Sequence, residues 1–365
     1  MSKSTQDVMI QLDHVSKVYA GHSEPAVDDF SMDIPRGEIV IFLGPSGCGK
    51  TTTLKMINRL IEPSGGRIIL NGEDVTRVDV NQLRRKIGYV IQQIGLFPHM
   101  TIEDNIGLVP KMLGWPQSQL KGRVGELLEM VGLNPDTYRK RYPKQLSGGQ
   151  QQRVGVARAL AADPPVLLMD EPFGATDPII REHLQDELLQ IQAKVKKTMV
   201  FVTHDIDEAL RLGNRIAILR EQSRIAQYAP PDEILAHPAN EFVSNFIGSG
   251  VSLKRLQVIP LRSVKLQSWP QVSADDKTQR QAVVVENNAV TGVMREGKLF
   301  PAPTVSVFGM LHTALDRLLL SESRAVCVVD DQQRYIGVIT IDTIMDELRS
   351  THYSTRYDAP TGASA

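Results

Sequence analysis

The stretch GEIVIFLGPSGCGKTT, residues 37–52, constrains the fold more than any other part of the chain. It opens with a short apolar run without alternation, which is typical of a strand buried on both faces of a parallel sheet. The residues that follow fit the spacing G-x-x-x-x-G-K-T, and a helical pattern, TTTLKMINRLI, continues from them. A glycine loop between such a strand and a helix presents consecutive backbone N–H groups to phosphate oxygens. The sequence therefore predicts an α/β domain with a phosphate-binding loop.

Three more short apolar runs follow, PVLLMD at 165–170, TMVFVT at 198–203 and RIAIL at 215–219. Helical stretches such as REHLQDELLQIQAKV separate them. This alternation predicts a doubly wound domain with helices on both faces of a parallel sheet. Between about residues 98 and 160 the pattern becomes helical, which predicts a helical insertion on that core. The domain is expected to span residues 1–235.

A second, smaller domain is expected in the last third of the chain. The Pro and Gly content around residues 236–250 predicts a linker. Residues 324–348 have the pattern of strand, turn, strand and helix, and residues 281–299 show the same rhythm with part of the helix missing. These segments predict a repeated β-β-α unit in an α+β domain over 251–350. The polar tail, 351–365, is expected to be disordered.

The bulk composition excludes several classes of protein. Lys and Arg (41) nearly balance Asp and Glu (42), and the net charge of −1 argues against nucleic acid as a partner. The cysteines Cys48 and Cys327 are too few for a disulfide framework and fit a reducing compartment, and nothing indicates a role for Cys327. Neither a signal peptide nor the roughly 20 apolar residues of a membrane span is found. We expect a cytoplasmic chain that reaches any membrane through a partner.

The glycine loop supplies the first candidate nucleotide contacts. Lys50 would reach the β- and γ-phosphates, and the Thr51 hydroxyl could hold Mg²⁺. The helix start and Lys50 are expected to lower the pKa of Cys48, so that alkylation would block nucleotide binding; the alternative is a packed, inert thiol. The candidate binding residues are Gly44, Pro45, Ser46, Gly47, Cys48, Gly49, Lys50, Thr51 and Thr52.

Two acids end one predicted strand and a histidine ends another. The string VLLMDEP places Asp170 and Glu171 side by side after a buried apolar run, where adjacent carboxylates are costly without a cation. Asp170 is the candidate Mg²⁺ ligand, and Glu171 could orient and activate an attacking water. His204, in FVTHD, is expected to contact the γ-phosphate or that water, although a lone histidine at such a place is more often structural.

A second glycine-rich helix start occurs in LSGGQQQR, at Ser147, Gly148 and Gly149. The first N–H groups and the positive dipole end of a helix can bind an anion. Because the first loop already provides for one phosphate chain, this helix start is redundant unless it faces a nucleotide bound to another subunit. The alternative is an ordinary helix cap.

The order of five motifs, GPSGCGKTT, VIQQ, LSGGQ, VLLMDEPF and TH, resembles the ATPase subunit of an ABC (ATP-binding cassette) transporter over residues 8 to about 235. The resemblance implies a P-loop NTPase cassette with a parallel-sheet core, a helical subdomain, and ATP and Mg²⁺ as cofactors. It also implies that two copies pair head to tail with two ATP molecules between them. Each ATP would lie between Lys50 of one copy and four residues of the other, which are Ser147, Gly148, Gly149 and Gln150.

Three further positions take expected roles from the same resemblance. Tyr19 would stack on adenine, and the alternative is a buried core tyrosine. Gln92 would touch Mg²⁺ or the attacking water, as metal ligand and catalytic residue, and relay the nucleotide state to a membrane partner. Asp177 would lie at the nucleotide site, in the loop that crosses the dimer interface, where Thr176 replaces the usual leucine.

A chain with one cassette and no membrane span resembles the subunit of an importer. The stretches LRRKIGYVIQQIGLFPHMTIEDNI and VTHDIDEALRLGNRIAIL are similar to subunits for glycine betaine, carnitine and choline. The resemblance implies a homodimer beneath two integral-membrane permease subunits, with a substrate-binding protein, at the cytoplasmic face of the inner membrane. An importer for another small solute and a non-transport, ATP-switched binding protein remain alternatives.

The repeats at 281–299 and 324–346 resemble a pair of CBS (cystathionine β-synthase-type) units. In units that bind adenosine ligands, a hydroxyl residue is followed three positions later by Asp. Here Thr340 is followed by Thr343, which argues against nucleotide sensing. Ionic-strength sensing and support of the dimer remain open as roles.

A cluster of basic residues precedes these repeats. Residues 251–274 contain four basic side chains and no acid. This composition predicts either a basic patch for an anionic membrane surface or a solvated face. The four residues are Lys254, Arg255, Arg262 and Lys265.

Overall fold

The computed structural model describes residues 7–91, 95–174, 177–273, 279–286 and 289–350. Gln92, Thr176 and the tail at 351–365 lie outside the described residues. The chain divides into two compact units, residues 1–231 with 239–246, and residues 232–238 with 247–365. In the described part of the chain, no helix combines the length and the apolar character needed to cross a membrane.

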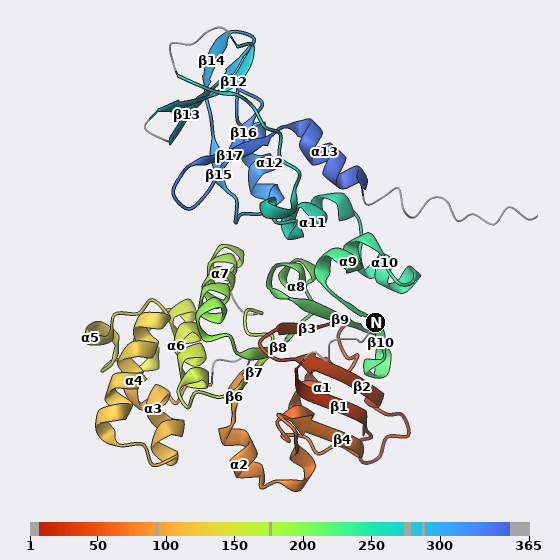
Figure 1. Cartoon of the computed structure of the whole chain (residues 1–365). Coiled ribbons are helices and arrows are strands. Elements are labelled where there is room, and N and C mark those ends of the chain that lie inside the picture. Colours follow the sequence, from red (N-terminus) through yellow and green to blue (C-terminus); the bar gives the residue numbers. More distant parts are fainter. Residues whose placement is uncertain (1–6, 92–94, 175–176, 274–278, 287–288, 351–365) are drawn as a thin grey trace, which may run out of the picture. The chain divides into compact units, whose positions relative to one another are not determined.

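A six-stranded sheet forms the centre of the first unit, in the order β10-β9-β3-β8-β7-β6 (Figure 1). All neighbours pair in parallel except β10 with β9. Every residue of β3 is buried, as its unbroken apolar run predicts. The four predicted strands are confirmed. The bounds are β3 (Ile39–Leu43), β6 (Ile87–Val90), β7 (Val166–Asp170), β8 (Thr198–Thr203), β9 (Arg215–Leu219) and β10 (Ile225–Ala229).

A second, antiparallel sheet, which the sequence did not indicate, packs on the same core in the order β2-β1-β4-β5. Ile10 of β1 lies opposite Ile34 of β2 and Leu70 of β4. The inward side chains of this sheet share one hydrophobic cluster with Phe42 of β3 and Leu54 of the helix after it. The strands are β1 (Val8–Lys17), β2 (Val27–Pro35), β4 (Gly65–Leu70) and β5 (Glu73–Asp74).

The helical insertion is present as expected. Helices α3, α4 and α6 contact one another, and each buries apolar side chains. Examples are Ile106 of α3, Leu127 of α4 and Val154 of α6. The insertion contains α3 (Ile102–Met112), α4 (Gln117–Met130), α5 (Pro135–Tyr138), the 3₁₀ turn η2 (Pro143–Gln145) and α6 (Gly148–Leu160). Around the two sheets lie α1 (Lys50–Ile57), η1 (Val75–Arg77), α2 (Val80–Arg85), α7 (Pro178–Val195), α8 (Ile206–Leu212) and η3 (Glu221–Ser223).

The segment indicated as a linker, 236–250, is not irregular throughout, because α10 (Glu241–Ile247) lies inside it. Helix α9 (Pro231–Ala236) precedes α10, and α11 (Val251–Val258) follows it. The proline and glycine residues lie between these helices, where they separate short helices from one another.

The second unit contains two sheets, β11-β12-β13-β14 and β15-β16-β17. The expected second repeat is present as strand, strand and helix, β16-β17-α13. The first repeat differs, because a third strand, β14, follows its hairpin where the second has a helix. The elements are η4 (Leu261–Ser263), β11 (Gln271–Val272), β12 (Gln281–Glu286), β13 (Ala289–Arg295), β14 (Lys298–Pro301), β15 (Thr304–Ser306), α12 (Leu311–Leu319), β16 (Val326–Val329), β17 (Tyr335–Ile339) and α13 (Ile341–Ser350).

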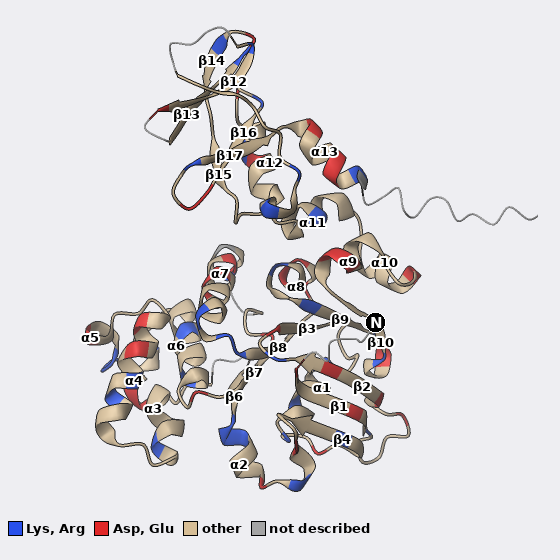
Figure 2. Ribbon diagram, in the orientation of Figure 1, with Lys and Arg blue, Asp and Glu red and all other residues tan. Residues whose placement is uncertain are grey.

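The four basic side chains do not form one exposed patch or face, because Arg255 is buried and Lys254 is partly buried. Arg255 is 6% exposed, and its Nη1 donates to the carbonyl oxygen of Leu348 in α13 (3.0 Å). Helix α13 is rich in acidic residues (Figure 2). Lys254 donates to the carbonyl oxygen of Ile247 (3.0 Å). Arg262 and Lys265 are exposed, and Lys254 is partly exposed.

Candidate functional site

The glycine loop runs from the end of β3 into α1, and its geometry requires glycine. Gly49 has φ of 108°, a left-handed conformation that other residues rarely adopt. A Cβ atom there would lie 2.6 Å from the carbonyl oxygen of Ala26 and would overlap Ser223 Oγ. Pro45, Ser46 and the glycine that follows are exposed at the loop surface. The loop is therefore a rigid backbone cradle that is open on one side.

Lys50 is held at the floor of this cradle. Its side chain is 5% exposed, and Nζ donates to the carbonyl oxygens of Gly44 and Pro45, each at 2.8 Å. A buried ammonium group needs such partners, and phosphate oxygens are stronger acceptors than carbonyls. The arrangement places one positive charge where the loop can receive an anion.

Thr51 and Asp170 meet beside the cradle. Thr51 Oγ1 donates to Asp170 Oδ1 at 2.8 Å, although the residues are 119 positions apart. Hard oxygen ligands of this kind suit Mg²⁺, which keeps several waters or phosphate oxygens and needs few protein ligands. Among the described residues, no group of three His, Cys, Asp or Glu side chains could hold a metal by itself. The pair fits a shared Mg²⁺ site; the third candidate, Gln92, lies outside the described residues.

Glu171 and His204 lie together at the ends of β7 and β8. Glu171 has φ of 44° and its N–H donates to the carbonyl oxygen of Val202 (3.0 Å), which fixes the turn after β7. His204 Nδ1 lies 3.3 Å from Glu171 Oε1. The His204 side chain is 59% exposed and that of Glu171 24%, so both remain accessible to water. The structure thus brings Lys50, Thr51 and the three strand-end residues to one edge of the sheet, where parallel strands end.

Tyr19 lies at the same edge, and its side chain is not buried in the core. It is 39% exposed, and its hydroxyl lies 3.5 Å from Thr52 Oγ1. Lys17 Nζ lies 5.3 Å from the centre of the ring. The exposure of the ring excludes the alternative of a core tyrosine.

The expectation of a reactive Cys48 is wrong. Cys48 is buried, with 1% exposure. Burial raises the pKa of its thiol, although the Lys50 charge acts to lower it. The loop folds this side chain inward, away from the open side of the cradle. The packed, inert thiol is the alternative that the geometry favours.

Ser223 supports the cradle and was missed by sequence reasoning. It is fully buried in η3, has φ of 60°, and its N–H donates to the carbonyl oxygen of Cys48 (2.6 Å). Its Oγ donates to the same oxygen (3.3 Å) and lies 3.0 Å from Thr53 Oγ1. The only signal in the sequence is the polar turn REQS between two strands, and nothing in that turn indicates contact with a loop 175 residues away.

The second glycine-rich helix start carries a helix cap. Ser147 Oγ accepts from the N–H of Gln150 (3.3 Å), and Gln150 Oε1 accepts from the N–H of Ser147 (3.1 Å), which forms a capping box. Yet Ser147 and Gly148 remain exposed, and a Cβ on Gly148 would meet no atom within 4 Å. Among the described residues, no hydrogen bond joins this helix start to the cradle. Asp177, after β7, is likewise exposed.

A hollow of about 360 Å³ lies at the other end of α1. It has apolar walls and three arginines, with no carboxylate among its lining residues. Its polar and aromatic lining residues are Asn58, Arg84, Arg85, Tyr89, Phe97 and Arg158. Burial and the charge of Asp170 raise the pKa of Tyr89 well above its ordinary value.

In the second unit, the hydroxyl groups of Thr340 and Thr343 are already occupied. Gln267 Nε2 donates to Thr340 Oγ1 (3.0 Å) and to Thr343 Oγ1 (3.1 Å), and the two hydroxyls lie 3.2 Å apart. A ribose at this place would have to displace the glutamine amide.

The comparisons with known proteins agree with this geometry. Residues 27–174 match the family described as ABC transporter. OsmV of Salmonella typhimurium, an osmoprotectant import ATP-binding protein, is 48% identical over 94% of this chain and 97% of its own. OpuCA of Bacillus subtilis, a glycine betaine/carnitine/choline transport ATP-binding protein, is 46% identical over 93% of this chain and 96% of its own.

A solved structure has the same fold as the first unit. The dimeric bacterial ABC transporter cassette MJ0796 is 36% identical, with a TM-score of 0.54, and the match covers 61% of this chain and 99% of that cassette. Another structure of MJ0796 is a dimeric post-hydrolysis state bound to ADP and Pi. These similarities identify the chain as an ATP-hydrolysing cassette, and the cradle, the Thr51–Asp170 pair and the Glu171–His204 pair are its candidate nucleotide site. The chain belongs to the ABC transporter family, among the ATP-binding subunits named for osmoprotectant import.

Proposed function

We propose that the chain energises an importer of quaternary-amine osmoprotectants such as glycine betaine, carnitine and choline. In this proposal it works as a homodimer beneath two permease subunits, at the cytoplasmic face of the inner membrane, with a substrate-binding protein completing the complex. The observation that carries the proposal is similarity over nearly the whole length, including the second unit, to relatives named for these solutes. A cassette alone would not single out this cargo.

Within one copy, the site residues divide the work of phosphoryl transfer. Lys50 would bind the terminal phosphates, and Thr51 with Asp170, joined by Gln92, would hold Mg²⁺. The ion, when bound, neutralises negative charge on the phosphate oxygens. Glu171 would accept a proton from the attacking water, while His204, at 3.3 Å, orients the carboxylate and faces the γ-phosphate. Tyr19 would stack on adenine beside Thr52.

The exposed start of α6 supports a site shared between two copies. Its N–H groups and dipole favour an anion, yet no hydrogen bond among the described residues joins it to its own cradle. A twofold pairing would place Ser147, Gly148, Gly149 and Gln150 of one copy on the nucleotide held by Lys50 of the other, and Asp177 in the shared interface. The dimeric state of the similar cassette MJ0796 supports the pairing of two copies.

The hollow beside α1, α3 and α6 suits the permease contact. It is concave, lined by apolar side chains, and rimmed by exposed residues such as Phe97 (40% exposed). A segment of a membrane subunit seated there would touch both the core and the helical insertion. A movement of the helical insertion relative to the core on ATP binding would then be transmitted to the membrane subunit.

Uptake by cells tests the proposal. A strain without the gene for this chain receives the wild type, Lys50→Ala, or the control Lys194→Ala, an exposed lysine at the end of α7. We expect labelled glycine betaine, carnitine or choline to enter with the wild type and the control, and not with Lys50→Ala. Uptake of all three that does not depend on the chain would contradict the cargo. Loss of uptake of a different solute would indicate another importer, and no transport defect at all would favour a non-transport switch.

A further inference from the structure

Lys17 lies against the ring of Tyr19, which is exposed at the edge of the nucleotide site. Strand β1 ends at Lys17, and Tyr19 follows two residues later. The Nζ atom of Lys17 lies over the ring, 5.3 Å from its centre. A cation in this position is attracted by the electron density of the ring face. Because Lys17 takes one face, a base that stacks on Tyr19 must use the opposite face.

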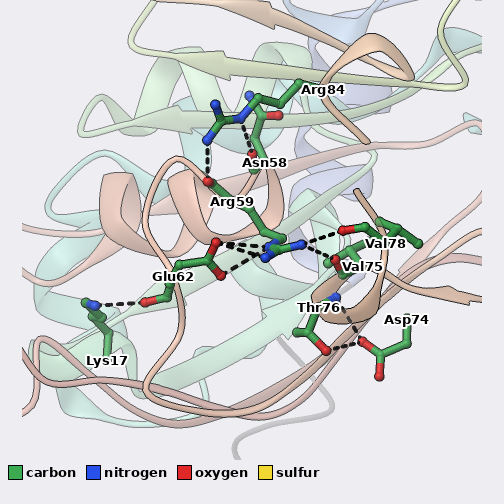
Figure 3. A network of polar contacts seen from close by, with 9 residues as sticks. All are labelled: Lys17, Asn58, Arg59, Glu62, Asp74, Val75, Thr76, Val78 and Arg84. Atoms are coloured by element: carbon green, nitrogen blue, oxygen red, sulfur yellow. Dashed lines mark hydrogen bonds and ion pairs between the residues drawn. The ribbon is translucent and has the colours of Figure 1, made fainter. Parts of the chain in front are cut away.

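The loop at residues 58–64, between α1 and β4, holds Lys17 in this position (Figure 3). Lys17 Nζ donates to the carbonyl oxygen of Glu62 at 2.8 Å, although the two residues are 45 positions apart. An ammonium group has three N–H donors, so it can keep this hydrogen bond and lie over the ring at the same time. The Lys17 side chain is therefore fixed at its charged end and is not a freely moving surface lysine.

The 58–64 loop is itself fixed by Arg59, which has φ of 46° and a side chain that is only 13% exposed. Arg59 Nε lies 3.1 Å from each oxygen of the Glu62 carboxylate. Its Nη1 donates to the carbonyl oxygens of Val75 (3.0 Å) and Val78 (2.8 Å). Figure 3 shows the guanidinium between the carboxylate and these two carbonyls. A largely buried guanidinium with partners on both sides leaves Glu62 little freedom to move.

Ser64, in the same loop, holds the backbone directly before Tyr19. Its Oγ accepts from the N–H of Val18 (3.0 Å) and donates to the carbonyl oxygen of Val18 (3.2 Å). Its N–H donates to the carbonyl oxygen of Ser16 (2.8 Å). One short loop thus contacts the backbone on the way to Tyr19 and the cation that lies over its ring.

Helix α1 connects this loop to the phosphate cradle. Its first residue, Lys50, forms the floor of the cradle, and the loop follows its last turn. The Tyr19 hydroxyl lies 3.5 Å from Thr52 Oγ1, near the start of the same helix. The ring is therefore held at two points, at its hydroxyl by the start of α1 and over one face by Lys17. Both points are fixed relative to the cradle, which sets the distance between a base contact and a phosphate contact.

We propose that Lys17 is a positioning residue for adenine binding. Its ammonium group, held by the Glu62 carbonyl, keeps the Tyr19 ring in the orientation in which the base stacks. Lys17 acts through the ring and not by touching the nucleotide. The ring is ordered before ATP arrives, so that binding does not have to immobilise it. This inference rests on the proposed stacking of adenine on Tyr19 and adds the residue that prepares that contact.

The test measures the binding of two ligands to purified full-length chains by calorimetry. The ligands are ATP and inorganic tripolyphosphate, which has no base, and Mg²⁺ is left out so that hydrolysis does not interfere. Lys17→Met keeps an unbranched apolar side chain and removes the ammonium group. The matched control is Lys194→Met, at an exposed lysine of α7.

We expect Lys17→Met to weaken ATP binding about two- to fivefold, as the loss of an exposed cation–π contact would, and to leave tripolyphosphate binding unchanged. Lys17→Arg should restore most of the ATP affinity, because a guanidinium also stacks on an aromatic face. The control should bind both ligands like the wild type. Unchanged ATP binding by Lys17→Met, or an equal loss of tripolyphosphate binding, would overturn the inference.

Tyr19→Ala separates this inference from the contact on which it rests. Alone, it should weaken ATP binding about 5- to 150-fold, as the loss of one stacked base would. Adding Lys17→Met to Tyr19→Ala should cause no further loss, because Lys17 acts through the ring. The same loss with and without the ring would show that Lys17 touches the nucleotide itself, and would overturn its positioning role. If Tyr19→Ala bound ATP like the wild type, the proposed adenine contact would fail first.

Discussion

Two substitutions at Ser223 should show separately what its hydroxyl and its left-handed backbone conformation contribute to the free energy of unfolding. Ser223→Ala loses the Oγ contacts to Cys48 and Thr53 but leaves no orphaned group. The Cys48 carbonyl keeps the Ser223 N–H (2.6 Å), and the Thr53 hydroxyl keeps the carbonyl of Gly49 (3.1 Å). The expected loss in the free energy of unfolding is therefore that of one ordinary hydrogen bond, about 1 kcal/mol.

Ser223→Gly loses the same hydroxyl but also removes the Cβ atom from a residue with φ of 60°. A left-handed conformation destabilises a residue that has a Cβ by about 1–2 kcal/mol, and glycine is free of this strain. The extra freedom of glycine in the unfolded chain lowers the free energy of unfolding by about 0.5–1 kcal/mol. The glycine variant should thus be more stable than the alanine variant and close to the wild type. Because both lack the hydroxyl, both should bind ATP more weakly, by a similar factor.

Unfolding in urea is followed by the fluorescence of Trp115, in a Trp269→Phe background, because the two tryptophans lie in different compact units. ATP affinity is measured by calorimetry. A glycine variant less stable than the alanine variant would refute the strain argument. Unchanged ATP affinity in both variants would show that Ser223 does not support the cradle.

The remaining predictions concern the acids and the thiols. Glu171→Gln should slow hydrolysis by about 10²–10⁴-fold, the usual share of a positioned base, while ATP still binds; a normal rate would contradict that role. Burial raises the pKa of Cys48 and raises that of Cys327 to about 12, so iodoacetamide should modify neither thiol of the folded chain and both after unfolding, as read by mass spectrometry. Burial also raises the pKa of Glu208, so its charge costs stability as the pH rises above the ordinary value of 4.5. Glu208→Gln should therefore raise Tm at pH 8, with a gain that shrinks toward pH 4; a gain that is independent of pH would exclude this cause.

Four strands of the main sheet could be predicted because each contains an unbroken apolar run. The run IVIFL of β3 is buried on both faces, and the motifs follow directly at strand ends. The antiparallel sheet escaped prediction for a physical reason. Strand β1 changes register between Leu12 and Val15, where His14 has φ of 52°, and this irregularity breaks the alternation that would reveal a half-buried strand.

Site residues could be predicted where a local sequence motif indicates their chemistry. They could not be predicted where burial or a hydrogen-bond partner depends on segments far away in the sequence. Thr51 and Asp170 were expected together because their motifs need one ion. The pKa of Cys48 could not be predicted, since its burial depends on how the loop folds against η3, far away in the sequence. The same holds for Arg255, whose partner is a carbonyl 93 residues later in α13.

The most direct test of a nucleotide shared between two copies is the mass of the Glu171→Gln chain in solution, by sedimentation or light scattering. The account predicts a monomer without nucleotide and a dimer with ATP and Mg²⁺, because slow hydrolysis traps the paired state. Adding Ser147→Arg should abolish that dimer while each monomer still binds ATP through Lys50. A mass that is the same with and without ATP, or a dimer that forms equally well with Ser147→Arg, would contradict the account.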